Sequence, residues 1–148
     1  MDTSISRSAE DTRGLGREWA VNATAGWVIA LTGDLGSGKT ELVKGFAAGL
    51  GASARVHSPT FALIHEYQGT RLALHHLDLY RLETAEAVLR AGLEEYLVQP
   101  SGVSIVEWAE RWFDAASGSP RLPGRLRRVW FETIGPFERK IRYEDFGA

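Results

Sequence analysis

The 148-residue sequence contains no cysteine. Disulfides, a thiol nucleophile and a cysteine-ligated zinc site are therefore excluded, and the absence is typical of a reducing compartment. The sequence also lacks an excess of one charge, since 17 basic residues face 19 acidic ones and the formal net charge is −2. No global field draws the chain to nucleic acid or to a membrane, so an RNA contact would need a local basic patch or a partner protein.

Long apolar runs are missing as well, because no stretch approaches the length of a membrane span. The N-terminal region carries Asp2, Glu10 and Asp11 and has no apolar segment of the kind found in signal peptides. We therefore expect a soluble, cytoplasmic protein with no membrane or DNA contact. The length favours a single domain over residues 1–148.

A glycine-rich motif, G-x-x-x-x-G-K-T, is the strongest signal in the chain. The motif and the residue after it are, in order, Gly33, Asp34, Leu35, Gly36, Ser37, Gly38, Lys39, Thr40 and Glu41. This is the P-loop pattern, in which glycines let backbone N–H groups surround phosphate oxygens. Lys39 would contact the β- and γ-phosphates, and the Thr40 hydroxyl would bind Mg²⁺. The motif predicts a site for ATP or ADP with Mg²⁺.

The flanking segments distinguish a P-loop from an ordinary glycine-rich turn, because a P-loop follows a buried strand and begins a helix. The run from Trp27 to Leu31 is apolar and rich in β-favouring residues, as expected for a central parallel strand. After the motif, apolar residues recur at helical spacing as far as Leu50, and Gly51 follows where a helix would end. Both flanks favour nucleotide binding, with the N-terminal dipole of the helix directed at the phosphates.

The rest of the chain predicts a mixture of strands and helices. Residues 1–6 are expected to be loose, and a helix is expected from Ser8, which can cap it, although Gly14 and Gly16 weaken that prediction. Further strands are expected at 61–67, 71–78, 103–107 and, as a C-terminal pair within 127–145, at 127–133 and 139–145. Further helices are expected at 83–93, 94–98 and 108–113, and a loop at 117–124.

The strands at 61–67 and 71–78 flank a short glycine turn and predict an antiparallel hairpin, whereas the P-loop strand predicts parallel pairing. This combination argues for an α/β fold. We expect a three-layer, P-loop NTPase-like domain with a mixed parallel and antiparallel sheet flanked by helices.

A P-loop hydrolase also needs an acid that holds Mg²⁺ or its water ligands, usually at the end of a buried strand. Glu107 ends a continuously apolar strand and is the better candidate; Asp78 ends an alternating run and could be a second metal ligand or could orient the attacking water. The alternative for each is a surface or capping carboxylate.

Thr60 is a third candidate, because GTPases keep a γ-phosphate-sensing residue in the loop after the P-loop helix. Its alternative role is that of a turn residue after Pro59.

Other polar and aromatic residues are interpreted as structural. His75 and His76 are adjacent on a strand and point to opposite faces, so they do not form a chelating pair. Trp108 and Trp112 would share one face of a helix. The tryptophans expected in or beside the core are Trp19, Trp27 and Trp130.

A local basic cluster allows two interpretations. It is either a solvated loop and strand edge or a contact for tRNA or a partner protein. Its members are Arg121, Arg125, Arg127 and Arg128.

Four motifs together resemble one family. They are G-D-L-G-S-G-K-T at 33–40, S-P-T-F at 58–61, H-x-D-L-Y-R-L at 76–82 and V-E-W-A-E-R at 106–111. In this order and spacing they are similar to the TsaE (YjeE) family, the bacterial ATPase component of tRNA threonylcarbamoyladenosine biosynthesis. One departure is Ala109, where the family usually has proline, and the C-terminal region matches only weakly.

The resemblance implies a role for each matching position. Asp78 would be an essential acid near the γ-phosphate, and Glu107 would be a magnesium ligand. Thr60 would lie in a switch-like loop, and Trp108 would lie close enough to the nucleotide to report its binding. The P-loop residues keep the roles that their own motif predicts.

The resemblance also implies partners, the TsaD and TsaB proteins, which transfer a threonylcarbamoyl group onto adenosine 37 of tRNA. The ATPase would reset or activate that complex, would meet tRNA only through it, and would turn over slowly alone. Rival functions are a small-molecule or nucleotide kinase, for which the chain has little room, and a non-catalytic nucleotide-binding adaptor. A GTPase switch is disfavoured because the chain has no N-K-x-D guanine motif.

Overall fold

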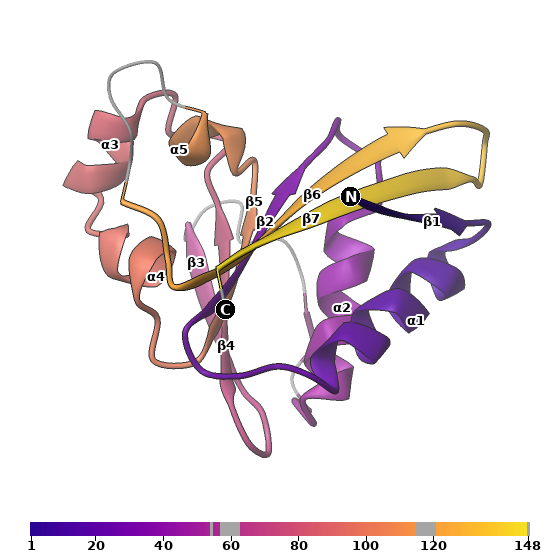
Figure 1. The fold of residues 1–148 in the computed structure, drawn as a ribbon, viewed down its shortest axis with the longest axis horizontal. Helices are drawn as coiled ribbons and strands as arrows, with labels where there is room; N and C mark the ends of the chain where they lie inside the picture. Colours follow the sequence, from indigo (N-terminus) through magenta and orange to yellow (C-terminus); the bar gives the residue numbers. More distant parts are fainter. Residues whose placement is uncertain (54, 57–62, 115–120, 148) are drawn as a thin grey trace.

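The computed structural model describes residues 1–53, 55–56, 63–114 and 121–147. Within these residues the chain forms one seven-stranded sheet with helices on both faces (Figure 1). The elements are, in chain order, β1 (Asp2–Ser6), α1 (Ala9–Ala20), β2 (Trp27–Thr32), α2 (Lys39–Gly49), β3 (Ile64–Gln68), β4 (Ala73–Asp78), α3 (Ala85–Arg90), α4 (Glu94–Val98), β5 (Val103–Glu107), α5 (Glu110–Phe113), β6 (Arg125–Thr133) and β7 (Arg139–Gly147). None of these helices is long and apolar enough to cross a membrane.

The sheet mixes parallel and antiparallel pairs, as the sequence predicts. Its strand order is β1-β7-β6-β2-β5-β4-β3. The central strands β6, β2, β5 and β4 are parallel, whereas β3 at one edge and β7 and β1 at the other are antiparallel to their neighbours. The predicted α/β fold with a mixed sheet is therefore confirmed.

Helices cover the two faces of the sheet separately. On one face, Phe46 of α2 belongs to the same buried cluster as Ile29 and Ile105 of the sheet. On the other face, Leu97 of α4 belongs to a second cluster with Val28 of β2. Figure 1 shows α1 and α2 on one side of the strands and α3, α4 and α5 on the other. This arrangement gives the three layers that the sequence predicts.

The prediction that residues 1–6 are loose is wrong. Asp2–Ser6 form β1, which pairs with β7 along its whole length. Ser6 is buried, and its hydroxyl lies 2.7 Å from the Thr12 hydroxyl and 2.8 Å from the Ser8 carbonyl oxygen. This short polar segment has no strand signature of its own. It is ordered because the open edge of β7 offers unpaired backbone groups.

Several boundaries differ from the predicted ones. The helix expected at 83–93 is shorter, since α3 ends at Arg90 and Gly92, with a φ of +77°, separates it from α4. The strand expected at 61–67 is β3, which begins at Ile64. Residues 57–62 and 115–120 lie outside the described residues. The C-terminal pair extends beyond 127–145 at both ends.

Helices α1 and α2 approach each other closely at two glycines. A Cβ at Gly16 would lie 2.3 Å from the Leu42 carbonyl oxygen, and a Cβ at Gly45 would lie 1.9 Å from the Arg13 carbonyl oxygen. Glycine weakens an isolated helix because it costs conformational entropy. Here packing against a neighbouring backbone outweighs that cost, which explains why α1 forms despite its glycines.

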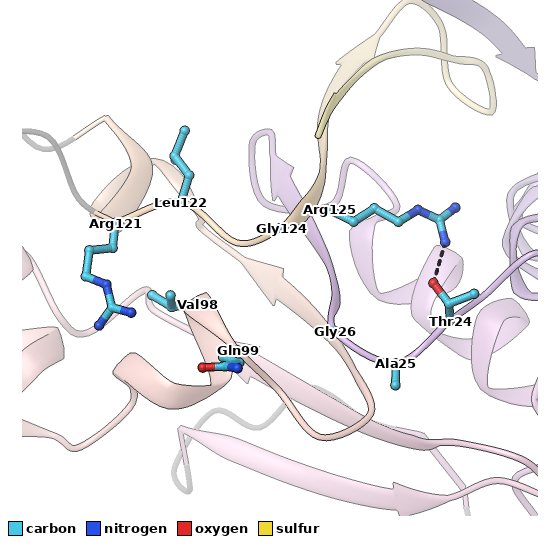
Figure 2. Close-up of a pocket in the computed structure, with 9 residues that line it drawn as sticks. All are labelled: Thr24, Ala25, Gly26, Val98, Gln99, Arg121, Leu122, Gly124 and Arg125. Carbon is cyan, nitrogen blue, oxygen red and sulfur yellow. Dashed lines mark hydrogen bonds between the residues drawn. The ribbon is translucent and has the colours of Figure 1, made fainter. Parts of the chain in front are cut away.

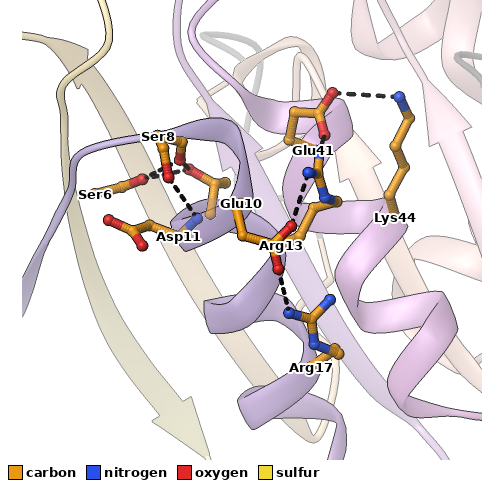
Figure 3. A network of polar contacts seen from close by, with 9 residues as sticks. Ser6, Ser8, Glu10, Asp11, Arg13, Arg17, Glu41 and Lys44 are labelled. Carbon is orange, nitrogen blue, oxygen red and sulfur yellow. Dashed lines mark hydrogen bonds and ion pairs between the residues drawn. The ribbon is translucent and has the colours of Figure 1, made fainter.

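Polar contacts join the same two helices at their outer surface (Figure 3). Arg13 lies 2.6 Å from Glu41 of α2 and 2.9 Å from Glu10 of its own helix. Ser8 caps α1 as predicted, because its hydroxyl accepts a hydrogen bond of 3.0 Å from the Asp11 amide. The Arg13–Glu41 pair is only partly buried, and ion pairs that remain in contact with solvent contribute little free energy. The glycine-mediated approach is therefore the main constraint on α2, the helix that begins at the P-loop.

Gly45→Ala is expected to lower the free energy of unfolding by about 1–3 kcal/mol, because the added methyl group overlaps the backbone of α1. Urea denaturation measures the change. Gly14→Ala is the matched control, since a Cβ there meets only the Arg17 Nη2 at 3.8 Å. That variant should be neutral or more stable by up to about 1 kcal/mol. Equal losses in both variants would contradict the packing argument.

His75 is buried without a polar partner. It is 3% exposed, and neither ring nitrogen has a hydrogen-bond partner among the described residues. Its ring centroid lies 5.0 Å from that of Tyr96. Burial lowers the pKa of His75 below its ordinary value, while Glu66 and Glu95 act weakly in the opposite direction.

The free energy of unfolding is therefore expected to decrease as the pH falls below about 6.5, the ordinary histidine pKa. The unfolded chain takes up the proton more readily than the folded one, so stability is lost as the pH falls toward the lower pKa of the folded state. His75→Phe removes this contribution. Between about pH 7.5 and about pH 5.5 its urea midpoint should fall less than that of the wild type; an equally steep fall would exclude His75 as the cause.

Candidate functional site

The P-loop motif connects β2 to α2. Its backbone has φ values of +75° at Gly36 and +100° at Gly38, which glycine adopts without strain. A Cβ at Gly33 would lie 2.8 Å from the Phe131 Cβ, so the loop also needs glycine for close packing. Lys39 is the first residue of α2. The strand–loop–helix context that distinguishes a P-loop from an ordinary turn is present.

Parallel pairing brings the predicted acids to the P-loop. Glu107 of β5 is the register partner of both Leu31 of β2 and Asp78 of β4. The carboxyl-terminal ends of these three parallel strands lie next to one another, and a cavity of about 470 Å³ lies there. The residues lining it are Leu35, Gly36, Ser37, Gly38, Lys39, Thr40, Glu41, Asp78, Glu107 and Trp108.

Glu107 is a buried carboxylate, 4% exposed, at the base of this cavity. The Thr40 hydroxyl lies 3.1 Å from its Oε2 and 3.3 Å from its Oε1. The His76 Nε2 lies 2.6 Å from the same Oε2. Two of the three residues predicted to hold Mg²⁺, Thr40 and Glu107, are thus in direct contact although 67 positions apart in sequence.

Lys39 lies in the cavity with its ammonium directed at two neutral partners. It donates a hydrogen bond to the Gly33 carbonyl oxygen and lies 3.9 Å from the centroid of the Trp108 ring. Burial lowers the pKa of Lys39, while nearby carboxylates, Glu107 foremost, oppose that shift. The amine is therefore held in a partly desolvated place where an anionic ligand would stabilise its charge.

Asp78 is half-buried at the end of β4 and accepts a hydrogen bond of 3.0 Å from the Tyr80 amide. It lines the same cavity as Thr40 and Glu107. Thr60, the third candidate from the sequence, lies outside the described residues.

The sequence predicts a helix over 108–113, but Trp108 lies outside it, because α5 begins only at Glu110. Its φ is +58°, a left-handed conformation that is uncommon for a bulky residue. The chain turns sharply here, and the Ala109 amide donates a 3.1 Å hydrogen bond to the Leu31 carbonyl oxygen. The ring of Trp108 consequently lies over Lys39, whereas Trp112 packs in the core behind the sheet. The two tryptophans therefore do not form the shared helix face expected from their spacing.

The oxygen ligands at the cavity suit a hard cation such as Mg²⁺. No group of three or more His, Cys, Asp or Glu side chains within the described ranges could hold a metal by itself. A magnesium ion would therefore need water and phosphate oxygens as ligands in addition to the predicted protein ligands Thr40, Glu107 and Asp78. The donor set fits a metal that arrives with a nucleotide better than a permanently bound one.

Comparison with known proteins identifies the family. The family described as "Threonylcarbamoyl adenosine biosynthesis protein TsaE" matches residues 6–130. The chain belongs to the TsaE family. The tRNA threonylcarbamoyladenosine biosynthesis protein TsaE of Bacillus subtilis is 39% identical over 138 residues, which cover 93% of this chain and 82% of that protein. The TsaE protein of a Nostoc species is 49% identical over 105 residues, covering 69% of this chain and 64% of the relative.

A solved structure supports the same conclusion. The crystal structure of YdiB from Bacillus subtilis is 33% identical and has a TM-score of 0.75, covering 99% of this chain and 86% of that one. The resemblance drawn from the four motifs is confirmed, and so is the P-loop NTPase-like α/β fold.

Sequence reasoning missed two residues that contact the predicted TsaE site. His76 was grouped with His75 as structural, and the alternation of the strand does separate them, but His76 contacts Glu107. The signal was the spacing of His76 and Asp78, two residues apart and therefore on one face of β4. Arg139 of β7 donates a 3.1 Å hydrogen bond to the Gly36 carbonyl oxygen of the P-loop, and no motif indicated that contact.

The basic cluster includes two arginines that form ion pairs. Arg127 bonds to both carboxylate oxygens of Asp145, at 2.6 and 2.8 Å, and Arg128 bonds to both of Asp114, at 3.1 and 3.2 Å. The ion pairs neutralise two of the four arginines.

A further cavity of about 510 Å³ lies where β2 and β6 begin (Figure 2). Arg125, in its wall, lies 3.7 Å from the centroid of the Trp27 ring and donates a 2.9 Å hydrogen bond to the Thr24 hydroxyl. This cavity contains none of the predicted site residues. Its lining residues are Thr24, Ala25, Gly26, Val98, Gln99, Arg121, Leu122, Gly124 and Arg125.

Because burial outweighs the nearby carboxylates, Lys39 is expected to titrate below the ordinary lysine pKa of about 10.4. The measurement is an NMR titration of the lysine Cε signals, with Lys39→Ala used to assign the Lys39 signal. Glu107→Gln removes the largest opposing charge and should lower this pKa further. A midpoint for Lys39 above the ordinary value would contradict the desolvation argument.

Proposed function

We propose that this protein is a P-loop ATPase subunit in the tRNA threonylcarbamoyladenosine modification of adenosine 37. It binds Mg-ATP, hydrolyses it slowly alone and acts with TsaD and TsaB partner proteins. The observation that carries the proposal is the contact between Thr40 and Glu107 in a cavity lined by the P-loop. The printed names of the relatives supply the biological reaction, since they are tRNA threonylcarbamoyladenosine biosynthesis proteins.

Phosphate binding follows from the P-loop. Backbone N–H groups of the glycine-rich turn and the N-terminus of α2 face the phosphates, and Lys39 exchanges its contacts with Gly33 and Trp108 for phosphate oxygens. Displacement of the ammonium from the Trp108 ring would change the fluorescence of this tryptophan on binding. Thr40, Glu107 and Asp78 would hold Mg²⁺, which would neutralise charge on the β- and γ-phosphates.

The nucleoside would occupy the other side of the P-loop. A smaller cavity of about 170 Å³ lies there, and its walls include Ser8, Gly36, Phe137 and Arg139. Phe137 is 76% exposed and offers an aromatic face on which a base can stack. The smaller cavity would hold the base and the cavity of about 470 Å³ would hold the phosphates of a bound nucleoside triphosphate.

Hydrolysis requires an in-line attack by water on the γ-phosphate, for which Asp78, Thr60 or both would position the water. Catalysis is then mainly positioning and charge neutralisation. The described lining of the larger cavity includes one cation, Lys39. Slow turnover alone follows from this limited positive charge, and the TsaD and TsaB partners would complete or order the site. Because Arg127 and Arg128 are ion-paired, tRNA would be reached through the complex rather than by that cluster.

The testing experiment mixes the protein with purified TsaB, TsaD and tRNA and follows ATP hydrolysis and multi-turnover tRNA modification. Hydrolysis should be faster in the mixture than with the protein alone. Lys39→Ala and Glu107→Ala should each reduce it by about 100-fold or more, because the first removes a positive charge at the phosphates and the second removes a ligand of the Mg²⁺ that neutralises them. Both variants should also abolish multi-turnover modification.

Lys44→Ala is the matched control, because Lys44 lies on the same helix but pairs with Glu41 and is not part of the cavity lining. It should behave like the wild type. The proposal would be overturned if the rate of ATP hydrolysis were the same with and without TsaB and TsaD and if Lys39→Ala left tRNA modification unaffected. A phosphorylated acceptor product would instead establish a kinase.

A further inference from the structure

The Glu107 carboxylate is held from two directions. On the side of the P-loop it accepts hydrogen bonds from the Thr40 hydroxyl. From within the sheet it contacts the His76 Nε2 at 2.6 Å, the shortest of its described hydrogen bonds. Thr40 belongs to the P-loop motif, which accounts for its contact with Glu107. His76 belongs to no part of that motif, so its contact with Glu107 has a separate cause.

The position of His76 follows from the register of two central strands. His76 is paired with Ile105 of β5, and Asp78 is paired with Glu107, two residues further on. Alternation along a strand places His76, Asp78 and Glu107 on the same face of the sheet. His76 has no exposed surface, and its ring centroid lies 6.5 Å from that of Tyr67 on β3. Surrounding side chains thus fix the ring, and its Nε2 can reach only a neighbouring buried group.

The chemistry of the contact sets the direction of the hydrogen bond. An ionised carboxylate only accepts, so Nε2 must carry the hydrogen. The other nitrogen, Nδ1, is buried and has no hydrogen-bond partner among the described residues. A histidine kept in the core for packing alone has no need of this polar contact, and leaving Nδ1 unpaired has a free-energy cost. The bond to Glu107 is the polar function that the ring performs.

The two partners of Glu107 behave differently when a metal binds. Thr40 is itself a proposed metal ligand, so its hydroxyl would be shared between the carboxylate and the ion. His76 is behind the carboxylate and can keep its bond throughout. Ligating carboxylates commonly receive such hydrogen bonds, which orient them for the metal.

We infer that His76 is a positioning residue: its Nε2–H holds the Glu107 carboxylate in the orientation in which it binds magnesium. The inference rests on the proposed function, because it assigns Glu107 to the metal of Mg-ATP. His76 is not among the residues that line the cavity and would act only through Glu107.

The wild-type protein allows a first test by ¹⁵N NMR of its histidine side chains. The signals of His76 should show that Nε2 carries a hydrogen, with His76→Gln used to assign them. An unprotonated Nε2 would overturn the inference, because it could not donate to Glu107. The hydrogen on Nε2 is observed in the wild-type protein, and the variant serves only to assign the signals.

The second test compares His76→Gln with His76→Met. The two side chains are similar in length, but only glutamine can place an N–H donor near the position of Nε2. The probe is Mn²⁺ with the non-hydrolysable β,γ-imido analogue of ATP, and free Mn²⁺ is measured by EPR. His76→Met should weaken Mn²⁺ binding by about 10- to 100-fold, the usual effect of losing a partner of a metal ligand. His76→Gln should remain close to the wild type.

Two controls separate positioning from a general loss of structure. Analogue binding in EDTA, measured by calorimetry, should be the same in all variants, because it depends on the P-loop and not on Glu107. His75→Met alters the adjacent buried histidine, which has no described contact with Glu107, and should leave Mn²⁺ binding unchanged.

The outcomes distinguish the two proposals. If the wild type binds the analogue and Mn²⁺ but His76→Met binds Mn²⁺ equally well, the inference about His76 is overturned and the ATPase proposal stands. If His76→Gln is as weak as His76→Met, the role of His76 is structural and the inference is again overturned. If the wild type binds the analogue equally well with and without Mn²⁺, and Lys39→Ala binds it as tightly as the wild type, the proposed function is overturned. This inference is then overturned with it.

Discussion

Parallel pairing of β5 with β2 and β4 is the constraint on which the site depends. The pairing places the end of each strand at one edge of the sheet, where the P-loop, Glu107 and Asp78 meet. A slip of one residue would turn Glu107 to the opposite face of the sheet. β5 is buried along its whole length, with Ile105 packed on one face and Val106 on the other. Apolar packing on both faces therefore also sets the position of the acids.

Burial of opposite charges gives the cavity its chemical character. Glu107 and Lys39 are both nearly inaccessible to solvent, and a buried charge is costly unless hydrogen bonds and opposite charges compensate. Thr40 and His76 compensate Glu107, whereas Lys39 has one carbonyl oxygen and an aromatic ring as its nearest partners. The carboxylate is thus better satisfied than the ammonium. Such a cavity favours an anionic ligand at Lys39, which agrees with the proposed binding of nucleotide phosphates.

Membership of the TsaE family and the geometry of the site support each other at different levels. The family relates the chain to threonylcarbamoyladenosine biosynthesis proteins, but it does not explain how the site works. The geometry supplies that explanation in the form of a P-loop, a buried acid beside Thr40 and a tryptophan turned onto Lys39 by a left-handed backbone. Strain of this kind is often retained at functional sites. The partner proteins remain part of the proposal, and the single cation in the described cavity lining is the physical reason to invoke them.

The sequence by itself determined the local structures: the P-loop with its flanking strand and helix, the hairpin of β3 and β4, and the order of most elements. These depend on spacing, glycine and apolar periodicity within short segments. It also indicated Glu107 and Asp78, because each ends a strand. Only the tertiary structure decided that Asp2–Ser6 form a strand, that His76 holds Glu107 and that Arg127 and Arg128 are ion-paired. Each of these depends on residues that are distant in sequence, whose approach is set by strand register and packing rather than by any local pattern.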